Sequence, residues 1–209
     1  MRSGFAELLA VATLACLPLA APGPADAGPP VRSLIEQRQD RVVIQKYDIS
    51  CGAAALATLL RFQHGETVTE RQVALGMMGR PDYLADPQRV RIQQGFSLLD
   101  MVNFAERRGY RGRGLSEMTF PDLVELAPAV VPIRAHGYNH FVVFRGVLGK
   151  TVLIADPAFG TRAMSLDRFM AAWIDYPELG RVAFVVERRD GLIPPNQLAA
   201  RPEDFVTLY

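Results

Sequence analysis

The sequence predicts an α+β fold in which helices precede an antiparallel sheet. Largely apolar, helix-forming stretches occupy residues 51–126, whereas β-branched and aromatic runs bounded by Gly, Pro and Asn occupy residues 130–186. Helices that come first and strands that come later are typical of α+β domains. The 209 residues, 49% hydrophobic and 22% charged, suffice for one domain with a sizeable core.

The expected elements follow in order along the chain. Helices are expected over residues 51–61, 69–78, 97–108 and 118–126, and strands over residues 130–134, 140–147, 151–156 and 182–186. Before the first helix, an extended segment ends in a turn at residues 47–50. Residues 79–95 hold two prolines and several charges, so they predict a surface excursion between the second and third helices.

The charge balance argues against a nucleic-acid partner. The chain has 23 Lys and Arg against 22 Asp and Glu, for a net charge of +1. Proteins that bind the phosphate backbone depend on a basic excess, which this chain does not have.

The first 27 residues predict a secretory signal peptide. The apolar stretch over residues 5–21 follows an N-terminal arginine, and residues 25–27 (Ala-Asp-Ala) form a small-x-small cleavage pattern. Pro18 interrupts the stretch and Pro22 follows it, and the stretch is shorter than the ~20 residues of a spanning helix, so no membrane span is expected after cleavage. We therefore expect an exported, periplasmic protein; the alternative is a lipoprotein cleaved before Cys16.

The predicted domain organisation follows from this cleavage. We expect a signal peptide over 1–27, a linker or N-terminal arm over 28–40, a single domain over 41–190 and a C-terminal tail over 191–209. Cleavage leaves Cys51 as the sole cysteine of the mature chain. A lone thiol in an oxidising compartment is either buried and inert or a nucleophile, and the cysteine alone leaves both open.

Cys51 lies in the first turn of the helix predicted over 51–61, with Asp48 or Ser50 placed to cap it. This helix is almost uniformly apolar, which is typical of a buried central helix. The partial positive charge at a helix start favours a thiolate over a thiol. The position therefore suits a reactive cysteine.

A histidine and an aspartate are placed to meet on neighbouring strands. A hairpin closed by residues 147–149 would put His140 directly opposite Asp156, with both side chains on one face. Cysteine nucleophiles need such a pair, because the imidazole exchanges a proton with the thiol and the carboxylate orients the ring.

An oxyanion donor completes this chemistry. The backbone N–H of Cys51 supplies one donor, and the side-chain amide of Gln45, six residues earlier, is placed to supply another. A single glutamine is more often a surface residue, so Gln45 carries little weight by itself.

The other histidines are weaker candidates. We expect His64 to be an exposed loop residue at a helix end, and His136 is a second candidate base without a strand-fixed carboxylate partner. Three histidines and one mature cysteine without tight spacing do not form a metal-ligand pattern, so we expect no metal and no cofactor.

Three motifs together resemble the bacteriocin-processing cysteine peptidases, papain-like domains that cut leader peptides after a double glycine. The motifs are Gln45-x5-Cys51-Gly52-Ala53-Ala54, Asn139-His140-Phe141-Val142-Val143 and Ala155-Asp156-Pro157-Ala158-x-Gly160. The resemblance covers about residues 41–176. It implies a papain-like fold in which the nucleophile stands at a helix start packed on a C-terminal antiparallel sheet.

The resemblance also implies a role for each matching residue. Cys51 is the nucleophile, His140 the general base and acid, Asp156 the orienting carboxylate and Gln45 the oxyanion donor. The residues after the catalytic helix and the run 94–99 are implied to shape the substrate groove.

The expected function is that of an exported thiol peptidase that hydrolyses a secreted peptide or protein through a thioester. With a signal peptide and no transporter segments after residue 180, the chain resembles the stand-alone exported members, some of which serve secretion systems for surface fibres. The expected partners are such a fibre or leader-bearing subunit and components of the secretion system. Two alternatives remain: a catalytically silent peptide-binding accessory, and an acyltransferase that uses the same thioester.

Overall fold

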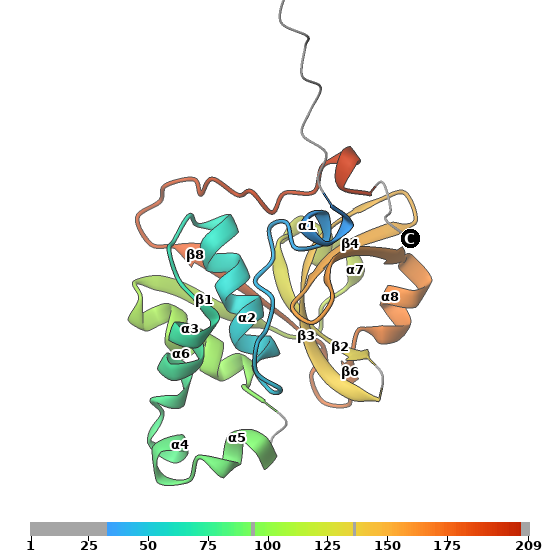
Figure 1. Cartoon of the computed structure of the whole chain (residues 1–209). Coiled ribbons are helices and arrows are strands. Elements are labelled where there is room, and N and C mark those ends of the chain that lie inside the picture. The colour runs from blue at the N-terminus through green and yellow to red at the C-terminus, as the bar shows by residue number, and fades with distance from the viewer. Residues whose placement is uncertain (1–32, 93–94, 136, 206–209) are drawn as a thin grey trace, which may run out of the picture. The chain divides into compact units, whose positions relative to one another are not determined.

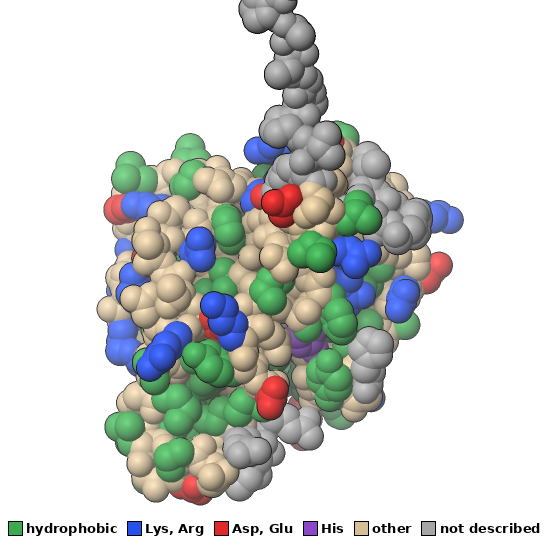
Figure 2. Space-filling model, viewed as in Figure 1, with side chains coloured by type: hydrophobic (Ala, Val, Ile, Leu, Met, Phe, Trp, Pro, Cys, Tyr) green, Lys and Arg blue, Asp and Glu red, His purple; other side chains and the backbone are tan. Residues whose placement is uncertain are grey.

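The computed structural model describes residues 33–92, 95–135 and 137–205. The predicted signal peptide lies outside these residues, as does His136. Among the described helices, none has the length and apolar character needed to cross a bilayer. On the face seen in Figure 2, hydrophobic and charged side chains of the described residues are interspersed.

An antiparallel sheet forms the centre of the domain (Figure 1). Its strands follow the order β1-β8-β2-β3-β4-β5, with every neighbouring pair antiparallel. The strands are β1 (Tyr110–Leu115), β2 (Ala129–Ala135), β3 (Tyr138–Leu148), β4 (Thr151–Asp156), β5 (Gly160–Ser165) and β8 (Ala183–Arg188). A separate two-stranded ribbon joins β6 (Asp175–Tyr176) and β7 (Gly180–Arg181).

Helices cover both faces of the sheet. They are α1 (Leu34–Arg38), α2 (Cys51–Thr58), α3 (Glu70–Met78), α4 (Pro81–Ala85), α5 (Gln88–Ile92), α6 (Leu98–Arg107), α7 (Phe120–Glu125) and α8 (Leu166–Ala172). A π-helical turn over Leu59–Gln63 extends α2, and a 3₁₀ turn over Pro202–Phe205 follows the last strand. One hydrophobic core lies between the sheet and α2, α3 and α6, and a second lies between the sheet and α7 and α8 (Figure 1). The predicted α+β class is thus confirmed.

The predicted helices form where their caps predicted them. Thr69, Ser97 and Thr119 each accept a hydrogen bond from the backbone three residues later, and the residue there bonds back to the cap. The elements that the sequence did not predict are α1, α4, α5, α8, β1, β5, the short ribbon and the 3₁₀ turn. Their segments are rich in Gly and Arg or lack alternating hydrophobicity, so they carry no clear local signal.

Residues 79–95 are not a simple surface excursion. They contain α4 and α5, and the side chain of Tyr83 is buried, where its hydroxyl donates to Asp100 at 2.7 Å. This segment therefore contributes to the helical core. Its prolines start a helix rather than break one, since proline is tolerated in the first turn.

His64 is also buried, contrary to the expectation of an exposed loop residue. Its Nε2 lies 3.1 Å from the carbonyl oxygen of Val186, and its ring packs edge-on against Tyr110. The π-helical turn directs this side chain inward onto β8. This packing assigns His64 a structural role.

The hairpin of β3 and β4 contains a β-bulge. Near the turn Gly146 pairs with Leu153, but on the other side of the bulge Phe144 pairs with Ile154. Arg145 is therefore an extra residue on β3. A bulge of this kind changes the register by one residue and so exchanges the faces of all residues beyond it.

Residues 191–205 pack against this bulge. The buried side chain of Arg145 donates to the carbonyl oxygen of Leu198 at 2.9 Å and to the carboxylate of Asp204 at 2.8 Å. Asp204 also pairs with Arg41, and Leu198 is itself buried. Part of the segment expected as a tail is thus integrated into the fold through buried charges.

Candidate active site

Cys51 is the first residue of α2, the most deeply buried helix of the domain. Its side chain is 8% exposed, and Gly52 next to it leaves room for Met101 and Phe141. The first N–H groups of a helix have no intrahelical partner, so donors and a partial positive charge surround the thiol. This surrounding suits a thiolate and a developing oxyanion.

His140 and Asp156 are hydrogen-bonded and buried. Nε2 of His140 lies 2.7 Å from Oδ1 of Asp156, and the two residues are 3% and 0% exposed. The predicted direct pairing is wrong by two positions, because Val143 pairs with Ala155 and the next step places Asp156 opposite Val142. His140 and Asp156 are therefore diagonal neighbours, which still share a face.

The bulge makes this shared face possible. Without the extra residue Arg145, the register near the turn would continue and place Asp156 opposite Val143. His140 would then project to the other face, because side chains alternate along a strand. The bulge thus places the side chains of His140 and Asp156 on the same face of the sheet.

The second ring nitrogen of His140 is left for Cys51. Since Nε2 faces Asp156, Nδ1 is the ring nitrogen that is left for Cys51. Burial alone lowers the pKa of His140, but interactions with Asp156 and Cys51 raise it to about 9. Asp156 and Cys51 therefore both favour the protonated form of His140.

Asp156 is fully saturated with hydrogen bonds. Oδ1 accepts from His140 and from the backbone N–H of Ala158 at 2.9 Å, and Oδ2 accepts from Nε and Nη2 of Arg162 at 3.0 and 2.7 Å. Burial alone raises the pKa of Asp156, but His140, Arg162 and Ala158 lower it below its usual value. Sequence reasoning missed Arg162, because β5, which carries it, was not predicted.

Gln45 lies beside the dyad but does not point a free amide at it. With Cys51, His140 and four neighbours it lines a cavity of about 280 Å³, while its Nε2 donates to the carbonyl oxygen of Tyr47 at 3.3 Å. Its backbone N–H donates to Pro157, which ties the segment to the end of β4. An amide nitrogen carries two donors, so one remains for a ligand.

Glu70 is a second residue that sequence reasoning missed. This buried carboxylate accepts from the backbone N–H of Lys46 at 2.9 and 3.1 Å and from the hydroxyl of Ser50. Ser50 stands at the start of α2 but makes no capping bond, contrary to one of the two predicted caps. One side chain of α3 therefore holds the residues adjacent to both Gln45 and Cys51.

A mainly apolar cavity of about 370 Å³ opens on the other side of the cysteine. Its lining residues are Cys51, Phe96, Ser97, Leu98, Leu99, Pro132, Asn139, His140, Phe141, Tyr176, Leu179 and Val182. Residues 96–99 belong to the run that the resemblance implied to shape the groove. The cavity can accept an extended, apolar peptide segment next to the thiol.

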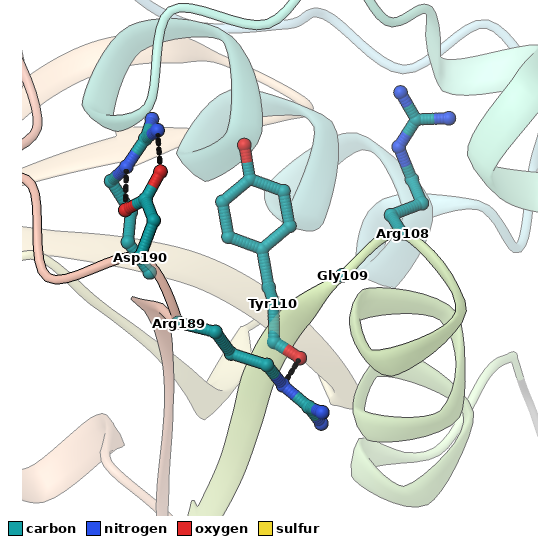
Figure 3. A pocket seen from close by; sticks show the side chains of 6 residues that line it. Arg108, Gly109, Tyr110, Arg189 and Asp190 are labelled. Carbon is teal, nitrogen blue, oxygen red and sulfur yellow. Dashed lines mark hydrogen bonds and ion pairs between the residues drawn. The ribbon is translucent and has the colours of Figure 1, made fainter.

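A different cavity lies at the edge of the sheet formed by β1 and β8 (Figure 3). It holds about 380 Å³, but its charged groups are already paired: Asp190 binds Arg188, and Arg189 donates to the carbonyl oxygen of Tyr110. Neither a thiol nor an imidazole lines it. Within the described residues, no group of three or more His, Cys, Asp or Glu is placed to hold a metal.

The family comparison agrees with this geometry. The model of the Peptidase C39 family matches residues 39–177, which span the helical layer and the strands that carry Cys51, His140 and Asp156. The chain belongs to the Peptidase C39 family. It is therefore a cysteine peptidase, as the motifs predicted.

Two curated relatives are named as proteases. The chain is 39% identical over 175 residues to a probable functional amyloid protease, FapD, of Pseudomonas aeruginosa, a match over 82% of this chain and 74% of the relative. It is also 39% identical over 185 residues to the FapD of Pseudomonas fluorescens, over 87% and 78% of the two chains.

Solved C39 peptidase structures share the fold. The peptidase domain of Streptococcus ComA, a bifunctional ABC transporter of a quorum-sensing pathway, has a TM-score of 0.56 at 22% identity, over 71% of this chain and 98% of that domain. A double-glycine-motif protease from an AMS/PCAT transporter, solved with its leader peptide, has a TM-score of 0.54 at 23% identity, over 70% and 90%. These likenesses confirm the predicted papain-like fold.

Proposed function

We propose that this C39 peptidase is exported and cleaves a protein of a functional amyloid pathway, with Cys51 as nucleophile, His140 as acid and base, Asp156 as orienting carboxylate and Gln45 as oxyanion donor. The observation that carries the proposal is the buried hydrogen bond from His140 to Asp156, with Cys51 lining the same two cavities as His140. A thiol with this environment at a helix start has the parts that nucleophilic acyl transfer requires.

In the first half of the proposed reaction the thiolate of Cys51 attacks the carbonyl carbon of the scissile peptide bond. The carbonyl electron pair moves to oxygen and forms a tetrahedral oxyanion. The imidazolium of His140 then gives its proton to the amide nitrogen, the C–N bond breaks, and the new amine leaves a thioester on Cys51.

Water completes the proposed reaction. Neutral His140 takes a proton from water as its oxygen attacks the thioester carbon, and the C–S bond breaks. The products are a carboxylic acid, the regenerated thiolate and the imidazolium. Asp156 stays ionised throughout, since its role is to hold the ring and stabilise its positive charge.

Two N–H groups are proposed to bind the oxyanion. One is the backbone N–H of Cys51 at the start of α2, and the other is the side-chain amide of Gln45. The bond from this amide to Tyr47 is long, at 3.3 Å, so a substrate oxygen can compete for the donor.

The amyloid pathway is proposed from the names of the relatives. The two FapD proteins are described as probable functional amyloid proteases, and each covers most of this chain at 39% identity. Export is proposed from the apolar segment and the Ala-Asp-Ala pattern of residues 25–27. The apolar cavity beside Cys51 supports a substrate with hydrophobic side chains near the cleaved bond.

The pH dependence of Cys51 alkylation tests the thiol–imidazole pair without a substrate. We expect iodoacetamide to modify Cys51 rapidly at pH 6 to 7, and the rate at that pH to fall at least about tenfold in His140→Ala. Mass spectrometry of the tryptic peptide separates Cys51 from Cys16. The matched control is His64→Gln, the other described histidine, at the far end of the helical segment that Cys51 begins.

Equal rates in the unchanged chain and His140→Ala would refute the pair. Complementation then tests the pathway: the chain, but not Cys51→Ala, should restore amyloid formation in Pseudomonas aeruginosa lacking its own FapD. Sequencing the exported protein should find Gly28 at its N-terminus. An intact N-terminus, or a new amide instead of an acid when an amine is added, would each overturn one part of the proposal.

A further inference from the structure

Arg162 lies on β5, the strand next to β4, which carries Asp156. Asp156 on β4 pairs with Gly160 on β5, so Arg162, two residues further, is its diagonal neighbour on the same face. His140 is the diagonal neighbour on the opposite side, from β3. A histidine, an aspartate and an arginine therefore follow one another over three adjacent strands.

The contacts divide the carboxylate of Asp156 into two halves. Oδ1 serves His140 and the backbone of Ala158, whereas Oδ2 receives both hydrogen bonds of the Arg162 guanidinium. A fork of two N–H donors is the strong, directional way to bind a carboxylate. Rotation of Asp156 away from His140 would break all of these bonds.

The surroundings of Arg162 favour this position. Its side chain is 30% exposed and its guanidinium lies 5.6 Å from the ring centre of Phe159, which shields it from water on one side. Gly160 has a φ of +86°, and a side chain there would overlap the carbonyl oxygen of Arg38. The start of β5 therefore packs against α1, and the partly exposed Arg162 pairs with the fully buried carboxylate of Asp156.

We propose that Arg162 is a positioning residue of this site: it offsets the negative charge of Asp156, so that His140 holds its added proton less tightly than it would beside an unpaired carboxylate. The proposal depends on the proposed function only for the roles of His140 and Asp156. In that function the imidazolium must give its proton to the leaving amine. A bare buried carboxylate would oppose this transfer, and the pair of Asp156 with Arg162 reduces the opposition.

The charged and titratable groups around His140 are few. Cys51 faces it from α2, Asp156 from β4, and Arg162 reaches it through Asp156 from β5. Asp48 and Tyr138 line the same cavity as His140. Of these groups Arg162 alone is a cation, so its removal should change the pKa of His140 in one direction, upward.

Nuclear magnetic resonance of His140 provides the test. The imidazole is titrated in the full chain carrying Cys51→Ser, which removes the coupled thiol, and its signal is identified by its loss in His140→Asn. Arg162→Gln should raise the pKa of His140 by about one pH unit. Arg162→Lys, which keeps the charge but not the fork, should raise it by less than half as much. Arg168→Gln, an exposed arginine on α8, should leave it unchanged.

The sign separates the proposal from a purely structural role. If Arg162 only supported the fold, its loss would loosen Asp156 and lower the pKa of His140, and that result, or no change, would overturn the proposal. Arg162→Leu, which can pack on Phe159, gives a second reading should Arg162→Gln not fold. Both variants need a normal thermal melting curve before titration.

A kinetic readout keeps this proposal distinct from the proposed function. Where peptide hydrolysis is measurable, its alkaline limb should shift upward by the same amount in Arg162→Gln. No hydrolysis in the unchanged chain would refute the peptidase role of the triad and leave the titration valid. If the peptide is hydrolysed but Arg162→Gln shifts neither the alkaline limb of the pH–rate profile nor the pKa of His140, the role of Arg162 is refuted.

Discussion

The two sides of the site are held in different ways. His140 and Asp156 lie on adjacent strands, where ladder hydrogen bonds, the bulge at Arg145 and the ion pair with Arg162 hold them in place. Nε2 of His140 lies 2.7 Å from Oδ1 of Asp156. Gln45 and Cys51 lie at the two ends of a loop, which is linked to the rest of the domain by the carboxylate of Glu70 and by the bond from the backbone N–H of Gln45 to Pro157.

The two sides also differ in how closely their side chains match the geometry of the proposed mechanism. The strand side already has the geometry that the proposed mechanism needs, whereas the amide of Gln45 still bonds to Tyr47 within its own loop. Strands constrain side chains through many bonds at once, but a loop depends on the few side chains that reach it. Changes on the loop side should therefore act on rate, and changes behind the strands should act on stability.

The largest effect expected on the loop side is that of Gln45→Ala. Loss of one oxyanion donor should lower kcat about 10² to 10³-fold with little change in KM, because the donor acts on charge that develops only in the transition state. Steady-state hydrolysis of a cleaved peptide measures this, with the exposed Gln88→Ala as control. A rise in KM alone would show that Gln45 binds substrate and does not stabilise the oxyanion.

On the strand side, activity should decline in alkali as His140 loses its proton. With its pKa near 9, the rate should fall about tenfold per pH unit above that value. The raised pKa also means that protonation stabilises the fold fully below pH 6.5, and that this stabilisation is lost as the pH rises through 9.

Thermal melting from pH 6 to 10 checks the linkage. The unchanged chain should lose stability through pH 9 more steeply than His140→Asn, which has no imidazole to titrate. Parallel curves for the two proteins would show that the proton on His140 does not contribute to folding.

A smaller effect is expected from Glu70→Gln. The amide oxygen still accepts from the N–H of Lys46, but the carboxylate charge is lost and the hydroxyl of Ser50 can only accept from the NH₂ group, so the tethers of the loop weaken. We expect kcat to fall about tenfold and the melting temperature to change little. Glu125→Gln on α7 is the exposed control.

A double substitution sharpens this prediction. If Glu70 acts through Ser50, then Ser50→Ala combined with Glu70→Gln should cost less than the two single changes added together. Full additivity would mean that the two residues support the loop independently.

The smallest effect on rate is expected behind the strands, from Asp204→Asn. Burial disfavours the charge of Asp204, yet Arg41 and Arg145 hold its pKa below the usual value. Removing the charge leaves Arg145 buried and uncompensated, which should cost about 3 kcal/mol of stability. Catalysis by the folded protein should change less than about threefold, since the strand ladder stays intact.

Chemical denaturation and peptide hydrolysis, measured on the same samples of Asp204→Asn, test the expected loss of stability and the nearly unchanged rate. Asp190→Asn is the matched control, because its pair with Arg188 is exposed and should contribute nothing measurable. If Asp204→Asn lowered kcat strongly at full stability, the 197–205 segment would belong to the catalytic side of the comparison.

The sequence by itself determined the fold class and the partners of the dyad. The turn at residues 47–50 and the apolar run of helix-forming residues after it act over a few residues, so they predicted where α2 begins and that Cys51 stands there. β-branched runs likewise predicted the strands that carry His140 and Asp156. These signals are local and survive without knowledge of the rest of the chain.

Only the tertiary structure decided how those residues are held. The bulge at Arg145 forms where residues 198–204 fold back, Arg162 lies on a strand without a hydrophobic pattern, and Glu70 reaches the loop from another helix. Buried polar contacts between distant segments leave no period in the sequence, because each depends on a partner that only folding brings near. For that reason the sequence indicated the residues that we propose as catalytic, but not the groups that hold them.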